Sequence, residues 1–443
     1  MQYNFRTQSL YTPLVDWTAE LQNTRSRYGG LVTELIEGET DFDELPLSTT
    51  NLDAMGVDSR SRTFTSAYYA GLVRLNRHDN LFNQWKLSGG SDWKPLLRGL
   101  LGRDVLNKHE MLSRNIFLRG PKDRWTYAGA ATDWATIGAN DTFKLETVID
   151  WNFRMGNIGS PVIPGDTAAA KVCIIPPGVE YALRTSLSLA ATNEAQMWRD
   201  ARLYSGQPLN FEIGEFSGVR FQKAQSDRFG INPAVLYNCG AIAKQFGVTT
   251  AIKMGDGAPD PTTTLVDEVW SIGQKNSTHY IQLENFAAGE FVVNDVVTIH
   301  NVRTSAYGVT NGVDPLAGRT IQRRVVVVDA VNNRLSFDRP ILFDYNVPIT
   351  GASVTGATAG TFYAWVTRGR NIAMCLTLGS RGGVLGAVVE PLEFHEPVAI
   401  DVLQKMWAFA YDMVLGYNVW DPNVFEVHFC AVHIPKPGGV TVP

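Results

Sequence analysis

The chain has 443 residues, of which 44% are hydrophobic and 19% are charged. This length predicts two or three domains with substantial cores, and the composition excludes wholesale disorder. The 39 basic and 44 acidic residues leave a net charge of −5, which argues against a general nucleic-acid-binding protein because phosphate affinity depends on clustered Lys and Arg.

Targeting and redox signals are sparse. The N-terminus lacks the apolar segment of a secretory signal, and no run reaches the ~18 apolar residues that a membrane helix needs. We therefore expect no membrane association. Four cysteines are spread over the chain without any C-x-x-C pair, so we expect reduced, buried thiols in place of a disulfide framework. They are Cys173, Cys239, Cys375 and Cys430.

The first 85 residues predict extended structure that needs support. Residues 1–50 are mixed and weakly periodic, with short helical turns expected at 17–21 and 31–36. We interpret them as an arm that would lie on another surface. Alternation over residues 57–85 then predicts a β-ribbon, and because a ribbon alone is marginal in water we expect it to pack on a neighbour.

Two helices are predicted next. The longer covers residues 93–119, where Ser91 or Asp92 can cap its start and Gly120-Pro121 stops it. The second covers residues 143–156 and ends at Gly156. One apolar face is predicted for the second helix, formed by Leu145, Val148, Ile149 and Phe153.

The second half of the chain is predicted to be rich in strands. Residues 255–365 resemble an inserted β-domain, with two strands around a polar turn within 290–300 and a hairpin turning at Asn332-Asn333. Residues 399–411 are periodic enough to predict a helix that has Val402, Met406 and Phe409 on one face. Residues 425–431 alternate and predict a strand.

Motifs for catalysis or cofactor binding are not found. The sequence has no phosphate-binding loop, dinucleotide fingerprint, nucleophile elbow or H-E-x-x-H zinc motif. The best metal candidate is the set His428, Cys430 and His433. A strand with a half-buried histidine and a core cysteine explains these residues more simply. We therefore predict no catalytic, cofactor-binding or metal-binding residues, and no cofactor.

Acidic pairs and tryptophans were also weighed as functional groups. The pairs Asp41/Asp43 and Glu393/Glu396 are interpreted as solvated loop residues, because nothing in the sequence suggests a cleft around them. The scattered tryptophans are not interleaved with basic residues as a base-stacking platform would require. We expect them to pack in cores and interfaces. They are Trp85, Trp93, Trp125, Trp134 and Trp151.

The most informative stretch is residues 171–225. Residues 172–175 predict a buried strand that Pro176-Pro177 ends, and a short helix starting at Gly178 follows. Tyr181 and Leu183 belong to that helix. A longer helix is predicted from Thr192 or Asn193, with four inward residues, and a hairpin of 211–213 and 219–221 then turns about 214–218. The inward residues are Met197, Trp198, Ala201 and Tyr204.

This order resembles the major capsid proteins of tailed bacteriophages, which share the Hong Kong 97-type fold with encapsulins and the herpesvirus capsid floor. In that family a strand ending in Pro precedes a short helix, a longer helix and a strand pair with the pattern I-G-x-x-x-G-V-R-F. Here Ile213-Gly214 and residues 218–221 match the pattern. Residues 236–247 look like the strand and turn that usually follow.

The resemblance implies an α+β, Hong Kong 97-like fold with an N-arm, E-loop, spine helix, peripheral and axial domains, and an inserted β-domain. The implied divisions are 1–50 for the N-arm, 51–92 for the E-loop, 93–170 for the peripheral domain with the spine helix, 171–254 for the first part of the axial domain, 255–365 for the inserted β-domain, and 366–443 for the return through the axial and peripheral domains.

The resemblance also implies a non-enzymatic function. Such a subunit self-assembles into hexamers and pentamers of an icosahedral head, which encloses double-stranded DNA without sequence-specific binding. Implied partners are a scaffolding protein, a portal and decoration or cement proteins. The implied location is the virion capsid, after assembly in the host bacterial cytoplasm.

Two departures from the family narrow the prediction. Some relatives cross-link subunits through an E-loop lysine, but this chain has no Lys before Lys86, so we expect no such isopeptide. The arm-like region starts at once after Met1, so we expect no removed propeptide.

Two alternatives stay open. One is an encapsulin-like compartment that holds a cargo enzyme, and the other is a β-rich hydrolase or carbohydrate-binding enzyme with an unrecognised site.

Overall fold

The chain forms two compact units in a computed structural model. One unit comprises Met1–Ile116 with Arg381–Asp421, and the other comprises Phe117–Ser380 with Pro422–Pro443. The residues that the structure describes are 10–17, 30–36, 58–64, 66–76, 94–118, 124–133, 136–157, 171–189, 199–200, 212–224, 234–236, 244–252, 278–300, 321–341, 345, 348–351, 360–379, 383–395, 398–399 and 406–432.

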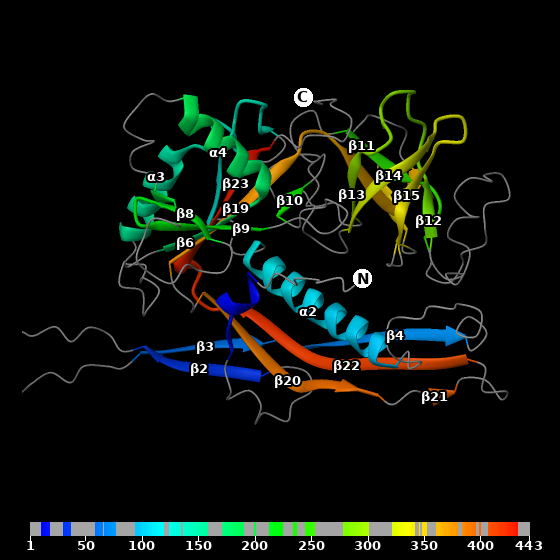
Figure 1. Ribbon diagram of the computed structural model, residues 1–443, viewed down its shortest axis with the longest axis horizontal. Helices are drawn as coiled ribbons and strands as arrows, with labels where there is room; N and C mark the ends of the chain where they lie inside the picture. Colours follow the sequence, from blue (N-terminus) through cyan, green and yellow to red (C-terminus); the bar gives the residue numbers. More distant parts are fainter. Residues whose placement is uncertain are drawn as a thin grey trace, which may run out of the picture. The chain divides into compact units, whose positions relative to one another are not determined.

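The first unit is built on an extended antiparallel sheet. Its centre is β22 (Met406–Val419), which pairs along eleven residues with β4 (Ser66–Asn76). On its other side β22 pairs with β20 (Val384–Phe394) and β21 (Val398–Ala399). A short strand, β1 (Asp16–Trp17), adds to β20 in parallel. Strands that are distant in sequence, β4 and β22, thus lie side by side (Figure 1).

Helix α2 (Lys94–Leu118) packs on one face of this sheet (Figure 1). Alternate residues of β22 face the helix, because successive side chains of a strand point to opposite faces. The resulting cluster joins two helix residues to three strand residues: Leu101, Val105, Tyr411, Met413 and Leu415. The long helix predicted over 93–119 is therefore confirmed.

A separate two-stranded sheet pairs β2 (Gly30–Ile36) with β3 (Asp58–Phe64) over seven residues. Strands β3 and β4 confirm the predicted strand character over 58–64 and 66–76, and residues 77–85 lie outside the described part of the chain. Each strand pairs with a distant strand and not with the other. The helical turn predicted at 31–36 is wrong, because this segment is β2. Pairing with β3 outweighs the weak local preference there.

The helix predicted over residues 399–411 is also wrong. From Met406 onward this segment is strand β22, with neighbours on both sides. Its apolar residues have helical spacing, but pairing with β4, β20 and β21 satisfies the backbone in an extended form. Residues 400–405 lie outside the described part of the chain.

The second unit contains an eight-stranded mixed sheet in the order β5-β23-β19-β6-β9-β8-β7, with β10 beside β19. Strands β19 and β23 are buried along their whole length, so the core lies on both faces. The predicted strands at 172–175 and 425–431 are confirmed. The bounds are β5 Trp125–Tyr127, β23 Phe425–Ala431, β19 Ile372–Leu378, β6 Lys171–Ile175, β9 Val219–Lys223, β8 Glu212–Phe216, β7 Arg199–Asp200 and β10 Val235–Leu236.

Helices α3 (Leu145–Asn157) and α4 (Pro177–Leu189) pack into the core on one face of this sheet. The helix predicted over 143–156 is confirmed, but its predicted face is partly wrong. Ile149 and Phe153 are 50% and 69% exposed. The helix carries apolar residues on two sides, and only the side that packs on the sheet is buried. The buried residues are Leu145, Val148, Trp151 and Met155.

The predicted β8–β9 hairpin is confirmed, and it turns at Ser217 and Gly218, both with positive φ. Helix α4 begins after Pro176 as expected and buries Leu183, while Tyr181 is exposed. The helix predicted from Thr192 or Asn193 is contradicted where the chain is described. Residues 199–200 form β7 and pair with β8.

A six-stranded antiparallel sheet, here called the barrel, completes the second unit in the order β11-β18-β13-β14-β15-β12 (Figure 1). The ends meet where the Thr249 N–H donates to the Gln282 carbonyl and the Glu284 N–H donates to the Gly247 carbonyl. The end strands thus meet at one bridge, between Val248 and Leu283, and among the described residues they do not pair along their length. The bounds are β11 Lys244–Val248, β18 Ala364–Arg368, β13 Val296–His300, β14 Ile321–Asp329, β15 Arg334–Ile341 and β12 Thr278–Gln282, and a small sheet of β16 Ile349–Gly351 and β17 Gly360–Phe362 lies beyond them.

The barrel tests two local predictions. The hairpin about Asn332-Asn333 is confirmed as β14–β15. The pair of strands predicted within 290–300 is wrong, because only β13 is a strand and the preceding residues form a turn with Asn294 at φ 75°. The inserted-domain bounds of 255–365 stay a prediction, and the barrel strands run from Lys244 to Arg368.

Candidate functional site

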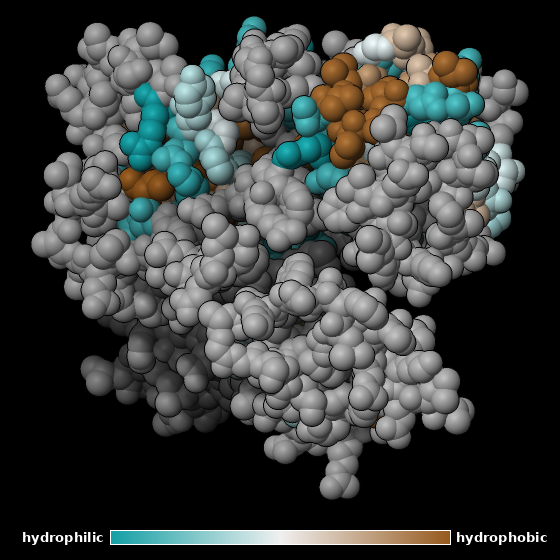
Figure 2. Space-filling view, turned by 45° about the vertical axis from the view of Figure 1, so that its right-hand side comes forward, coloured by the Kyte–Doolittle hydropathy of each residue, from teal (hydrophilic) through white to brown (hydrophobic). Residues whose placement is uncertain are grey.

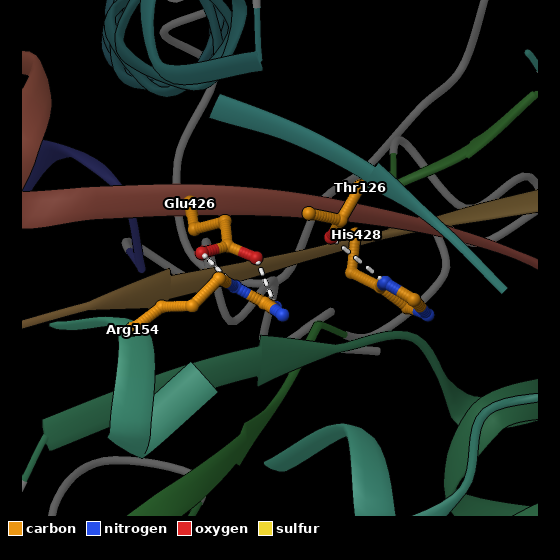
Figure 3. Close-up of polar contacts among 4 residues, drawn as sticks. All are labelled: Thr126, Arg154, Glu426 and His428. Atoms are coloured by element: carbon orange, nitrogen blue, oxygen red, sulfur yellow. Dashed lines mark hydrogen bonds and ion pairs between the residues drawn. The ribbon is translucent and has the colours of Figure 1, made fainter. Parts of the chain in front are cut away.

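The second unit holds a cluster of polar side chains in its core (Figure 3). Strand β23 places Glu426 and His428 on one face, because they are two residues apart. From α3, Arg154 reaches Glu426 with two contacts, Nη2 to Oε1 at 2.6 Å and Nε to Oε2 at 3.2 Å. From β5, the Thr126 hydroxyl lies 2.9 Å from Nδ1 of His428. The cluster ties a helix and an edge strand to β23.

His428 is held neutral by its surroundings. It is 2% exposed, and the rings of Phe143 and Trp151 meet it edge-on at centroid distances of 5.8 and 5.5 Å. Burial, with a smaller contribution from the positive charge of Arg154, lowers the pKa of His428 to about 3. A histidine so enclosed does not exchange protons with a substrate. The arrangement supports a core role.

The proposed metal set is only partly brought together. His428 and Cys430 share a face of β23, as the alternation predicted. His433 lies outside the described residues. Within the described part of the chain, no group of three or more His, Cys, Asp or Glu residues is arranged to hold a metal ion.

Three of the four cysteines lie in one core cluster of the second unit. Cys173, Cys375 and Cys430 are free and buried on neighbouring strands. Burial raises the pKa of the Cys173 and Cys375 thiols above the usual range, so they stay protonated. The predicted reduced thiols are confirmed for these three residues, and Cys239 lies outside the described part.

The remaining candidate acidic residues and tryptophans lie mostly outside the described part of the chain. Glu393 is exposed near the end of β20, while Glu396, Asp41 and Asp43 lie outside the described residues. Trp125 and Trp151 are buried, which confirms core packing for these two. The other three fall outside the described residues: Trp85, Trp93 and Trp134.

An exposed polar cluster lies on the sheet of the first unit. The Tyr68 hydroxyl donates to Oδ2 of Asp412 at 2.8 Å, and Nε2 of His395 lies 2.9 Å from Oδ1. The hydrogen bond from Tyr68 lowers the pKa of Asp412. These residues come from β4, β22 and the end of β20. Sequence reasoning missed the cluster because only the pairing of distant strands assembles it.

Residues 10–12 contact α2 through the carboxylate of Glu110. Oε1 of Glu110 accepts the backbone N–H groups of Leu10 and Tyr11 at 2.7 and 2.8 Å. Oε2 accepts the backbone N–H and the hydroxyl of Thr12 at 3.1 and 2.8 Å. These donors precede and begin the 3-10 helix η1 (Thr12–Leu14), whose first N–H groups have no partners within the helix.

The same segment is also fixed at its other end. Trp17 packs edge-on to His109 and Tyr417 at centroid distances of 5.9 and 5.5 Å. Trp17 also covers Gly386, where an added Cβ would lie 2.8 Å from its ring. Asp16 and Trp17 form the short strand β1 against β20. Four apolar residues of the segment are buried: Leu10, Tyr11, Leu14 and Val15.

Residues 10–17 therefore lie on their own chain. The sequence predicted an arm that needs a surface, and for this part the surface is α2 and β20 of the same unit. Contacts of the remaining arm with neighbours stay a prediction. No sequence signal marks the contact, because three of its four donors are backbone groups and all lie about a hundred residues from Glu110.

Apolar side chains are also exposed away from these clusters. On α3 they are Ile149 and Phe153, and at the barrel they include Val292, Val293 and Val326. Figure 2 shows hydrophobic groups at the surface, the larger toward the upper right where the barrel comes forward. Exposed apolar groups of this kind often mark contacts with other proteins. No helix among the described residues is long and apolar enough to cross a membrane.

The comparisons with known proteins give structural likeness only. No family model and no curated protein sequence matches the chain. The capsid of Ralstonia phage GP4 is similar at 10% identity and a TM-score of 0.48, over 97% of this chain and 90% of that one. The capsid of cyanophage P-SCSP1u is similar at 11% identity and a TM-score of 0.45, over 98% and 91%.

A third similar structure is the head of Helicobacter pylori bacteriophage KHP40, at 9% identity and a TM-score of 0.45, over 94% of this chain and 87% of that one. These structures belong to phage capsids, the class that the motifs within 171–225 resemble. At such identities and TM-scores they transfer no residue role to this chain.

Proposed function

We propose that this chain is the major capsid protein of a tailed bacteriophage, with a structural and non-enzymatic role. The observation that carries the proposal is the β2–β3 sheet. It has two strands, and among the described residues neither strand pairs with a third. Two-stranded sheets are marginally stable alone in water. A subunit that displays such a sheet is expected to complete it by contact with neighbours.

The order of elements supports the same proposal. The strand β6, helix α4 and hairpin β8–β9 follow one another with the capsid-family pattern at residues 213–221. Helix α2 lies on an extended sheet in the place that the resemblance gives to the spine helix. His428 is 2% exposed, which favours a structural role for this residue over a catalytic one.

The finer features belong to the same proposal. Residues 1–50 act as the N-arm, 51–92 as the E-loop, 93–170 as the peripheral domain and 255–365 as the inserted domain. Subunits form hexamers and pentamers of an icosahedral head around double-stranded DNA. Scaffolding, portal and decoration or cement proteins are the expected partners. The head assembles in the host cytoplasm and becomes the virion capsid.

Sedimentation of the full-length chain, expressed alone and with candidate scaffolding protein, tests the proposal. Fast-sedimenting particles of uniform size are expected, since stability would come from oligomerisation. A chain that stays monomeric under both conditions contradicts it. Particles from infected cells should hold nuclease-protected DNA. A cargo enzyme in its place would favour the encapsulin-like alternative, and a monomer with hydrolase or carbohydrate-binding activity would favour the third.

A further inference from the structure

Residues 10–17 cross two elements of the first unit. At one end they bind Glu110 of α2 through three backbone N–H groups and one hydroxyl. At the other end Asp16 and Trp17 pair with β20, and Trp17 packs against Gly386. We call residues 10–17 the strap. It connects the helix to the edge of the sheet on which the helix lies.

Helix α2 also contacts the sheet directly at several points along its length. Leu101 and Val105 meet Tyr411, Met413 and Leu415 of β22. Leu112 packs against the same cluster, and the Tyr417 hydroxyl lies 3.3 Å from Nδ1 of His109. The strap adds an attachment at Glu110, about one and a half turns beyond Val105, and links this part of the helix to β20. Each additional attachment along the helix further restricts its rotation and sliding on the sheet.

We propose that Glu110 is the positioning residue that docks the strap, and that the docked strap fixes α2 against β20 in the shape needed for assembly. The part of the inference that concerns assembly rests on the proposed function. A charged acceptor forms stronger hydrogen bonds than a neutral one, and all four contacts converge on one carboxylate. Gly386 is the second requirement, because any side chain there meets Trp17 and Val15 at 2.8 Å.

Hydrogen exchange of the full-length chain tests the docking. The reporters are the amides of residues 10–12, which donate to Glu110. Glu110→Ala should raise their exchange by about tenfold or more, as expected for local opening. Glu110→Gln should have a smaller effect, because it keeps an acceptor for Leu10 and Tyr11. If these amides are as well protected from exchange in Glu110→Ala as in the natural chain, the proposal is overturned.

Gly386→Ala is the independent variant, with Gly102→Ala as its matched control. Nothing lies within 4 Å of a Cβ added at Gly102 on α2. Gly386→Ala should expose the same three amides without touching Glu110, and Gly102→Ala should leave them protected. Normal exchange of α2 residues 101–105 in both variants would show that the unit is folded.

Particle yield tests the consequence for assembly. Glu110→Ala and Gly386→Ala should both lower the fraction of chain in closed particles, and Gly102→Ala should not. If the amides of residues 10–12 exchange fast in these two variants but the particle yield equals that of the natural chain, the proposal is overturned. If the natural chain forms no particles, the proposed function fails, while the exchange measurement still decides whether Glu110 docks the strap.

Discussion

Acid should destabilise the second unit through His428. The residue is neutral and buried, with Nδ1 near the hydroxyl of Thr126 and with Arg154 close by. Its folded pKa of about 3 lies below the ordinary value of 6.5. The unfolded chain therefore binds a proton that the folded chain excludes. The stabilising contribution is complete above about pH 6.5 and is lost as the pH falls from there toward 3.

The size of this destabilisation follows from the two pKa values of His428, about 3 in the folded chain and 6.5 ordinarily. Each pH unit in this window costs about 1.4 kcal/mol of unfolding free energy. At pH 5 the loss from His428 is about 2 kcal/mol relative to neutral pH, and it reaches about 4 kcal/mol at pH 3. A residue that is 2% exposed needs no large discount for solvent screening. Carboxylates add their own dependence, so variants must be compared at each pH.

Urea unfolding of the natural chain and of His428→Gln between pH 7.5 and 4.5 measures the contribution of His428 to the pH dependence of the unfolding free energy. Tryptophan emission follows the unfolding, and one contributor from the second unit is Trp151, whose ring centroid lies 5.5 Å from that of His428. His428→Gln should be less stable at pH 7.5 but lose about 1.4 kcal/mol less per pH unit below 6.5. Thr126→Val keeps the histidine and should retain the natural slope. Equal slopes for His428→Gln and the natural chain would refute the reasoning.

Further predictions concern packing and are measured by thermal unfolding. Phe153→Ser should change the unfolding free energy by less than about 0.5 kcal/mol, because the residue is 69% exposed. Trp151→Ala, at a buried position, should lower the unfolding free energy by about 3–5 kcal/mol. An equal loss in both variants would contradict the observed helix face. Gly71→Ala should destabilise the first unit by about 1–3 kcal/mol, since its Cβ would overlap the Tyr411 ring. Gly99→Ala, on an open helix surface, is the control and should not be destabilising.

Local signals in the sequence predicted the elements that depend on them. Pro176-Pro177 ends β6 and starts α4, Gly120-Pro121 lies just beyond α2, and the β8–β9 turn falls at Ser217 and Gly218. Each signal acts through the backbone of a few consecutive residues, so no tertiary contact is needed to interpret it.

The failures came where distant pairing decides the conformation. Residues 406–411 have helical spacing yet form β22, because β4 lies more than three hundred residues away in sequence and supplies the partner strand. On α3 both sides are apolar, and only the sheet determines that Trp151 is inside and Phe153 outside.

The functional contacts were less predictable than the fold. Glu110 had no motif around it, because its four donors belong to residues 10–12 and three are backbone groups. The Tyr68–Asp412–His395 cluster depends on the register between β4 and β22. The pairing of His428 with Cys430 on one face was visible from alternation, but its burial and its partner Thr126 were not.

The central claim is self-assembly into a shell, and electron microscopy of the purified full-length chain tests it most directly. The account predicts closed, hollow particles of uniform diameter with hexamer and pentamer arrangements on their surface. A field of isolated single subunits, with scaffolding protein present and at high protein concentration, would contradict it.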